Sequence, residues 1–149
     1  MSSKFGPAGG VGGSPYDAPA PTTGGPWKIS GMQGKSGSRI DQIEVVWSNQ
    51  KGGTESSPEF GGEGGSPFQF PISTGDYLTQ IVGTVGQYDS SVRLFSIQFV
   101  TSSGDKSPVY GQPGAAAFAF QCPSGYQITG IFGRSDQAVD ALGIYIDPI

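Results

Sequence analysis

The sequence predicts an all-β fold built from three related units of about fifty residues. Apolar and polar residues alternate in several short runs, which is typical of half-buried strands, and no run has the periodicity of an amphipathic helix. Glycine and proline, 26 and 12 of the 149 residues, separate these runs as turn residues do. A barrel, a sandwich or a three-fold prism would each satisfy these observations.

The first unit contains a strand–loop–strand block that recurs near the C-terminus. Residues 34–47 match residues 133–146 without a gap, at a glycine, a basic residue, a serine and an aspartate. Alternating runs at 27–32 and 126–131 precede the two loops and are expected to be strands. A middle copy spans residues 77–99, so the blocks begin near residues 27, 77 and 126.

Each unit also has a glycine-rich loop. Residues 9–19 recur as residues 61–71, with both glycine pairs, the Ser-Pro dipeptide, an aromatic residue and the final proline in the same positions. A shorter version at residues 110–114 leads to Phe118 and Phe120. We therefore expect three units built alike, each with one glycine-rich loop and one strand–loop–strand block.

Length and composition limit the class of protein. We expect a single domain over residues 1–149, because a chain of this length can bury a sizeable core. The net charge of −4 and the scattered basic residues count against a nucleic-acid partner or an anionic membrane surface. Without histidine, and with one cysteine, the chain cannot build a Ser-His-Asp or Cys-His system or a thiolate–imidazole metal cluster, so we expect no metal and no cofactor.

The N-terminal sequence and the single cysteine indicate in which cellular compartment the protein is expected. The first twenty residues contain no apolar segment of the kind found in signal peptides, and no run is long enough to span a membrane. Cys122 cannot form an intrachain disulfide and is expected to be a small buried apolar residue. These features favour a reducing, cytoplasmic location.

The motifs taken together carry a family resemblance. The GGxGG loop near the N-terminus, the segment G-x-S-x-x-x-V-D-A-L-G-I-Y-I at residues 133–146 and the three units resemble the jacalin-related lectins over essentially the whole chain. The resemblance implies a β-prism I of three four-stranded Greek-key sheets with pseudo-three-fold symmetry and sugar sites in loops at one end. Because residues 13–15 contain no processing linker, the chain is most similar to the single-chain, mannose-specific branch.

The resemblance also implies a sugar site in the first unit. In the family, a glycine, three variable residues and an aspartate supply backbone N–H donors and a carboxylate, and a facing glycine pair supplies one more N–H. Residues 37–41 match this pattern. An ionised aspartate can accept protons from two neighbouring hydroxyls, and glycine lets a sugar ring approach the main chain. The implied binding residues are Ser38, Arg39, Asp41, Gly64 and Gly65.

A second site is implied in the last unit, and its residues are Asp136, Gln137, Ala138, Asp140 and the facing Gly13. Asp136 stands where the family has glycine, and we expect the turn to survive because aspartate tolerates left-handed backbone better than most residues. In the middle unit Arg93 stands where the aspartate belongs, and it cannot accept a hydroxyl proton. Two working sites and a degenerate third are therefore expected.

Aromatic residues add candidates for contact with a ligand. Four of them lie on alternating strands and are expected in the core: Trp27, Trp47, Tyr126 and Tyr145. Three lie in loops or just after them and are the candidates for ligand contact: Tyr16, Phe68 and Tyr88.

Three functions remain open. The leading one is a lectin without catalysis, whose weak sites for mannose- or glucose-containing glycans would gain avidity in a homo-oligomer, a dimer or tetramer. The second is a glycosidase with Asp136 and Asp140 as its carboxylate pair, which their position in one small loop disfavours. The third is a structural or protein-interaction β-domain whose sugar sites have decayed.

Overall fold

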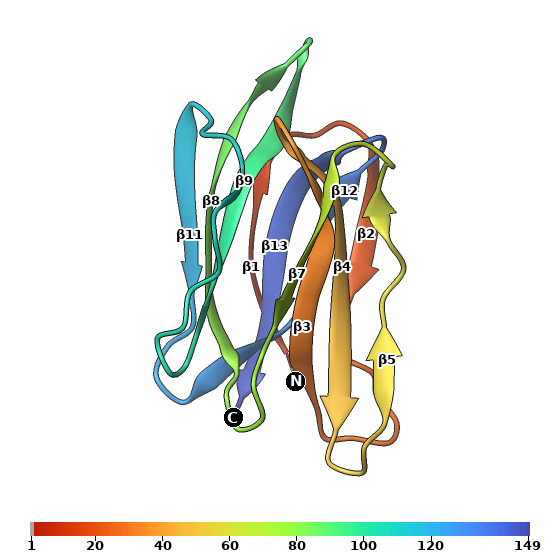
Figure 1. The fold of residues 1–149 in the computed structure, drawn as a ribbon, viewed down its shortest axis with the longest axis vertical. Coiled ribbons are helices and arrows are strands. Elements are labelled where there is room, and N and C mark those ends of the chain that lie inside the picture. Colours follow the sequence, from red (N-terminus) through yellow and green to blue (C-terminus); the bar gives the residue numbers. More distant parts are fainter. Residues whose placement is uncertain (1) are drawn as a thin grey trace.

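The computed structural model of the chain describes residues 2–149, and every regular element in that range is a β-strand. The strands form three antiparallel sheets that stand around a common long axis (Figure 1). Since these residues form no helix, they contain none that is long and apolar enough to cross a membrane. The predicted all-β prism of three sheets is confirmed.

Each sheet is built on a long central hairpin with shorter strands at its edges. The first sheet has the order β1 (Ser3–Gly9), β13 (Val139–Pro148), β12 (Tyr126–Ser135), β2 (Ser14–Ala18). The second has the order β5 (Thr54–Ser56), β4 (Ile40–Asn49), β3 (Trp27–Ser36), β7 (Ser66–Pro71), and β6 (Phe60–Gly61) also pairs with β4. The third has the order β10 (Tyr110–Gly111), β9 (Ser91–Thr101), β8 (Leu78–Tyr88), β11 (Ala116–Gln121).

The second sheet departs slightly from the four-stranded pattern. Its outer edge beside β4 is divided into two short strands, β5 and β6, whereas the first and third sheets have four strands each. Pro58 lies in the segment that separates β5 from β6, and a proline cannot donate a ladder hydrogen bond.

The repeat seen in the sequence reappears in the backbone. Strands β3 and β4 shift register between Ile29 and Gly31, and β12 and β13 shift between Ile128 and Gly130, the equivalent positions of the repeat. A second shift, just before the loop of each hairpin, also recurs. Because a bulge bends and twists its strand, the two hairpins curve alike and their loops leave the sheets in the same way.

Apolar side chains at alternating strand positions fill the space between the sheets. Each central hairpin contributes fully buried residues, among them Ile29, Ile81 and Ile128. Complete burial of one such side chain stabilises the fold by about 1.5–3 kcal/mol. This shared core fixes the three hairpins, and hence their loops, relative to one another.

Two aromatic pairs close the seams between neighbouring sheets. Tyr16 on β2 stacks on Phe60, with ring centroids 4.4 Å apart, and Phe68 on β7 stacks on Tyr110 at 4.1 Å. Tyr16 and Phe68 are both buried, so the expectation that they contact a ligand is wrong. Each follows a loop in the sequence, but each already lies on an edge strand whose alternation turns it inward.

The aromatic residues expected in the core follow the prediction in part. Trp47 and Tyr145 are buried, Trp27 is half-buried, and Tyr126 is exposed. Trp47 Nε1 donates to the carbonyl of Thr129 at 2.9 Å and so links the second sheet to the first. The prediction is wrong for Tyr126 because this residue begins β12 at the end of the prism, where the core stops.

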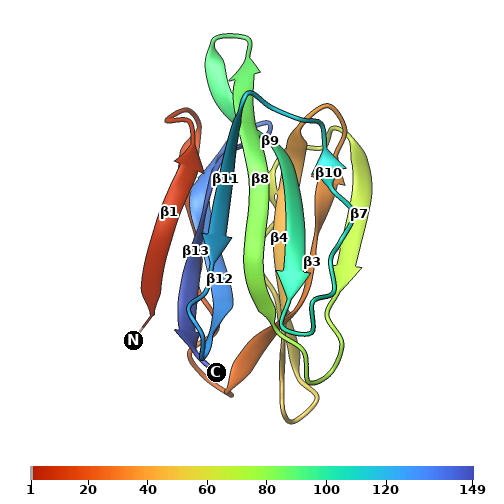
Figure 2. The ribbon, with the colours of Figure 1, turned by 90° about the vertical axis from the view of Figure 1, so that its left-hand side faces the viewer.

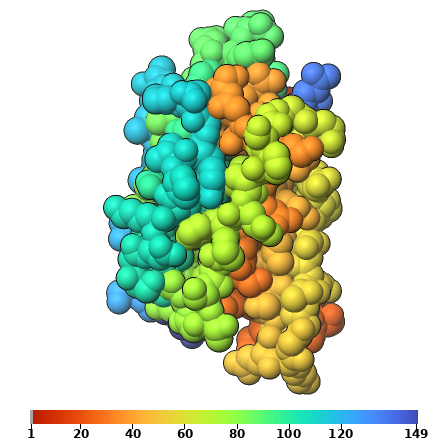
Figure 3. Space-filling model, in the orientation of Figure 1, coloured from red at the N-terminus to blue at the C-terminus, as the bar shows by residue number. Residues whose placement is uncertain are grey.

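One end of the prism carries the loops that the sequence singles out. They lie at the upper end in Figure 1 and comprise residues 10–13, 37–39, 62–65, 89–90, 112–115 and 136–138. The tip of the hairpin β8–β9 rises above the others (Figures 2 and 3). The N- and C-terminal ends of the chain lie toward the opposite end (Figure 2).

Candidate functional site

The predicted site residues come together as two groups at the loop end. Loop 37–41 faces the glycine-rich loop 61–65, and loop 136–140 faces the glycine-rich loop 10–13. In both groups an aspartate lies at the second position of the outgoing strand, Asp41 on β4 and Asp140 on β13. The structure therefore brings the carboxylates and the glycines into the arrangement that the family resemblance implied.

The Asp41 group is packed around its carboxylate. A Cβ added to Gly65 would lie 2.6 Å from Oδ2 of Asp41, and one added to Gly64 would lie 3.0 Å from Oδ1. Gly65 also has a φ of +77°, which L side chains rarely adopt. The backbone N–H of Gly62 donates to the Asp41 carbonyl at 2.8 Å and anchors the two loops to each other. Only glycine allows this close approach.

Arg39 connects the Asp41 group to the hairpin β8–β9. Its Nε lies 3.7 Å from Oδ1 of Asp41, and its guanidinium carbon lies 4.0 Å from the ring centroid of Tyr88. Tyr88 is 40% exposed, so it is the one aromatic candidate that remains at the surface. Burial raises the pKa of Asp41, while the charge of Arg39 lowers it. Ser38, at the tip of loop 37–41, is exposed.

The Asp140 group repeats this geometry. A Cβ on Gly12 would lie 2.7 Å from Oδ2 of Asp140, and Gly13, with a φ of +70°, packs against the carbonyl of Ser135. The backbone N–H of Gly10 donates to the Asp140 carbonyl at 2.9 Å, as Gly62 does to Asp41. The carboxylate of Asp140 is more enclosed, since its side chain is 2% exposed against 8% for Asp41.

The loop that leads to Asp140 keeps its turn despite the aspartate at its first position. Asp136 donates its backbone N–H to the carbonyl of Ala138 at 2.9 Å, matching the bond from Gly37 to Arg39 at 3.0 Å. Asp136 does not have a positive φ, so the expectation of left-handed backbone there is wrong. The turn closes in ordinary backbone space, and glycine is not needed. Asp136 and Gln137 are exposed, and Ala138 is fully buried.

Basic side chains hold the glycine-rich loops in place. Arg134 on β12 donates from Nε to the Gly12 carbonyl at 3.0 Å and from Nη2 to the Gly13 carbonyl at 2.8 Å. At the equivalent position Lys35 pairs with Glu63 at 3.2 Å. Arg134 thus ties the backbone of loop 10–13 to β12, whereas Lys35 contacts only the exposed side chain of Glu63, and composition and spacing revealed neither contact.

The middle unit contributes an arginine to the last unit. Nη1 of Arg93 on β9 lies 3.5 Å from Oδ1 of Asp140, and both side chains are largely buried. Burial raises the pKa of Asp140, Arg93 and Arg134 lower it, and Asp136 raises it. No sequence signal indicated this contact, because Arg93 belongs to a different repeat.

The loops of the three units touch one another. A Cβ on Gly62 would lie 2.3 Å from the Gln137 carbonyl oxygen, so the two groups are in backbone contact. A Cβ on Gly10 would lie 2.2 Å from the carbonyl oxygen of Val92, at the tip of β8–β9. With the Arg39–Tyr88 stack, these contacts make one continuous surface around the hairpin tip.

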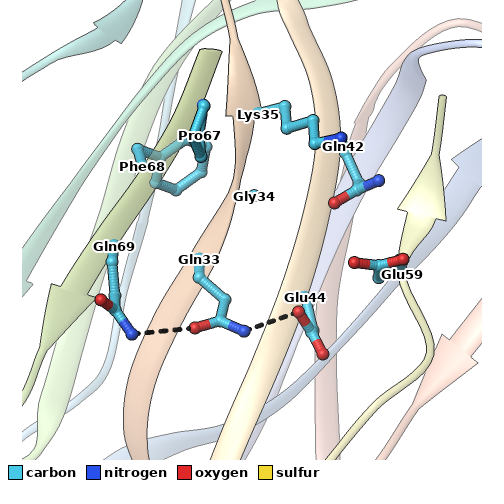
Figure 4. Close-up of a pocket in the computed structure, with 9 residues that line it drawn as sticks. All are labelled: Gln33, Gly34, Lys35, Gln42, Glu44, Glu59, Pro67, Phe68 and Gln69. Atoms are coloured by element: carbon cyan, nitrogen blue, oxygen red, sulfur yellow. Dashed lines mark hydrogen bonds between the residues drawn. The ribbon is translucent and has the colours of Figure 1, made fainter. Parts of the chain in front are cut away.

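Two other hollows are lined by polar side chains. On the outer face of the second sheet, a hollow of about 400 Å³ is crossed by a hydrogen-bonded row of Gln69, Gln33 and Glu44 (Figure 4). A cavity of about 730 Å³ at the opposite end includes Trp27 and Asp76. In this cavity Trp27 Nε1 donates to the Thr23 carbonyl and the Asp76 carboxylate accepts from two serines and two backbone N–H groups, while Oε1 of Gln127 has no hydrogen-bond partner.

Two further classes of site can be assessed within residues 2–149. In this range no three His, Cys, Asp or Glu side chains gather as metal ligands would. Cys122 is half-buried, and burial raises the pKa of its thiol to about 11. A thiol with such a pKa carries little thiolate near neutral pH and is a poor nucleophile.

Comparison with known proteins agrees with the fold and the motifs. The model of the Jacalin-like lectin domain matches residues 4–145. Horcolin from Hordeum vulgare is 32% identical over 146 residues, which cover 97% of each chain. AcmJRL, a mannose-binding jacalin-related lectin from Ananas comosus, is 25% identical with a TM-score of 0.85 over 99% of both chains.

A structure with a bound glycan is also similar. Calsepa lectin, from Calystegia sepium, solved in complex with a biantennary N-glycan, is 28% identical with a TM-score of 0.85, and covers 100% of this chain and 98% of its own. The matched domain spans nearly all of the prism and both candidate loop groups. The chain therefore belongs to the family of the Jacalin-like lectin domain.

Proposed function

We propose that this protein binds mannose- or glucose-type pyranoses, without catalysis, at two loop sites centred on Asp41 and Asp140. The observation that carries the proposal is the repeated packing of a carboxylate beneath a glycine-rich loop, with the same backbone bond in both places. Relatives support the choice of ligand, since AcmJRL is a mannose-binding lectin and Calsepa was solved with an N-glycan.

The chemistry suits adjacent hydroxyl groups. Each carboxylate can accept hydroxyl protons, and a hydrogen bond to a charged group contributes about 1.5–3 kcal/mol. Loop positions that are exposed, such as Ser38, Gly65 and Gln137, can donate backbone N–H groups to the same hydroxyl oxygens. The sites are shallow, so each is expected to bind a monosaccharide near the millimolar range, about 4 kcal/mol.

Retention on immobilised mannose tests the proposal. The native protein is expected to be retained and to be released by free methyl α-mannoside. The double variant Asp41→Asn/Asp140→Asn is expected to flow through, because an amide presents one carbonyl acceptor in place of a charged carboxylate. Asp105→Asn is the matched control, since Asp105 is an exposed acid at the opposite end of the prism. Retention of the double variant equal to that of the control would contradict the proposal.

Two other functions have distinct readouts. A glycosidase needs two carboxyl groups on either side of a scissile bond, whereas Asp136 is exposed and Asp140 buried within one loop. Turnover of an aryl mannoside would favour that function. A protein-interaction domain with decayed sites would give no signal on a glycan array.

Avidity would come from assembly. We propose a homo-oligomer, a dimer or tetramer, that presents several weak sites to one glycan-bearing partner. A molecular mass by light scattering equal to that of the 15.4 kDa chain would contradict this part of the proposal.

A further inference from the structure

The expectation that Arg93 stands at the aspartate position of the middle unit is wrong: Phe95 takes that place, because its carbonyl accepts from the N–H of Gln112 at 3.1 Å, as the Asp41 and Asp140 carbonyls accept from Gly62 and Gly10. Arg93 lies two residues before Phe95, near the start of β9. Nη1 of its side chain lies 3.5 Å from Oδ1 of Asp140 in the last unit. The middle unit therefore supplies a cation, Arg93, to the Asp140 site of the last unit.

The contact between Arg93 and Asp140 is important because the carboxylate is almost completely buried. The side chain of Asp140 is 2% exposed, and neither its Oδ1 nor Nη1 of Arg93 has a hydrogen-bond partner, so the two atoms meet as an ion pair. Gly12 lies against the other carboxylate oxygen, Oδ2. Among the remaining charged groups near Asp140, Arg134 is engaged with the carbonyls of Gly12 and Gly13, and Asp136 is an acid. Arg93 is therefore the cation that lies at ion-pair distance from the carboxylate.

We propose that Arg93 is a positioning residue for the Asp140 site, which orients the carboxylate so that it can accept hydroxyl protons. The inference rests on the proposed function. It assigns the middle unit, which has Phe95 in place of the aspartate, a supporting role at the site of the last unit.

A parallel at the other site supports this assignment. Asp41 also faces a guanidinium, because Nε of Arg39 lies 3.7 Å from its Oδ1. There the arginine comes from the same loop, whereas at Asp140 the corresponding loop position holds Ala138. Two site carboxylates thus have one arginine each, supplied from different units.

The charged groups around Asp140 predict how sugar binding at this site depends on pH. Burial raises the pKa of Asp140 and Asp136 raises it further, whereas Arg93 and Arg134 lower it. A protonated Asp140 would offer a poorer acceptor to a hydroxyl group. Sugar binding at this site should therefore be lost as the pH falls through the pKa of Asp140, and removal of Arg93 should move that loss to higher pH.

The experiment isolates the Asp140 site in an Asp41→Asn parent. Binding of methyl α-mannoside is followed by ¹⁵N-HSQC titration between pH 4 and pH 8. For Arg93→Gln in this parent, Kd at pH 7 is expected to rise about tenfold, a coupling typical of residues in contact. The pH midpoint of binding is expected to move up by about one unit, the usual effect of losing a neighbouring opposite charge.

Two comparisons separate positioning from damage to the fold. Arg93→Lys keeps the charge, so the pH midpoint should return to that of the parent, while Kd should stay about threefold higher because an ammonium lacks the planar fork of arginine. Arg93→Gln in an Asp140→Asn parent, read at the Asp41 site, should leave Kd unchanged. If Arg93→Gln does not fold, Arg93→Lys decides, and a Kd equal to that of the parent overturns the inference.

The outcomes distinguish this inference from the proposed function. Lack of sugar binding by the Asp41→Asn parent itself would overturn the Asp140 site, and the inference with it. Binding by the parent, with Kd and pH midpoint both unchanged in Arg93→Gln, would overturn the inference alone.

Discussion

At the scale of single residues, the two site carboxylates are buried where most aspartates are exposed. Counted over the whole residue, Asp41 is 6% exposed and Asp140 is 1% exposed. An arginine accompanies each carboxylate, at a distance longer than that of a good hydrogen bond. An ionised carboxylate in such a place costs stability unless a ligand completes its bonds. The two buried carboxylates are therefore expected to lower the stability of the folded state.

This cost predicts how Asp41→Asn changes stability. The pKa of Asp41 is raised even with Arg39 beside it, so the folded state binds a proton more tightly than the unfolded chain. The cost of the ionised carboxylate is therefore full above the raised pKa and disappears as the pH falls toward the value in the unfolded chain. We expect Asp41→Asn to melt at or above the native temperature at pH 7, with the gap narrowing toward pH 4. A variant that melts clearly lower at pH 7 would show that the carboxylate stabilises the fold.

At the scale of elements, the glycine-rich loops and the hairpins could be predicted from the sequence, because repetition reveals both. The family resemblance also implied that Gly64 and Gly65 lie opposite Asp41, as the structure shows. Contacts between units could not be predicted in this way. Arg93 reaches Asp140 and Tyr88 stacks on Arg39 only because the core holds three hairpins side by side, and a linear repeat carries no such information.

The aromatic residues show a second feature that could not be predicted from the sequence, the direction of a side chain at the start of a strand. Tyr16 and Phe68 follow glycine-rich loops and look available to a ligand, yet each is the third residue of an edge strand and points into a seam. Where a loop ends and a strand begins decides the direction of the side chain, and such boundaries are the least certain feature of a pattern.

The glycine-rich loop predicts a local effect on binding. Gly65→Ala would place a methyl group 2.6 Å from Oδ2 of Asp41, on backbone with a φ of +77°. We expect loss of sugar binding at the Asp41 site and a stability loss of about 1–3 kcal/mol from the strained backbone. Thermal melting and titration of this site in an Asp140→Asn parent measure both effects.

Gly52→Ala is the matched control for this prediction. Gly52 has a similar φ of +82°, but an added Cβ would meet nothing within 4 Å. It should lose stability without losing affinity. Equal affinity in Gly65→Ala and Gly52→Ala would contradict the role of the loop in binding.

At the scale of the whole molecule, three similar units have taken different roles around one axis. Two units present carboxylates beneath glycine-rich loops, and the third supplies Arg93 and Tyr88 to the other two. All these groups meet at one end of the prism, while the chain termini lie toward the other (Figure 2). Such an arrangement leaves the loop end open to a glycan.

A crystal soaked in methyl α-mannoside tests this account most directly. The account predicts one sugar at each of the Asp41 and Asp140 loops, with ring hydroxyls within hydrogen-bond distance of both carboxylates, and none at the equivalent position of the middle unit, which holds Phe95. Sugars bound equally at all three units, or both acidic loops left empty at saturating concentration, would contradict it.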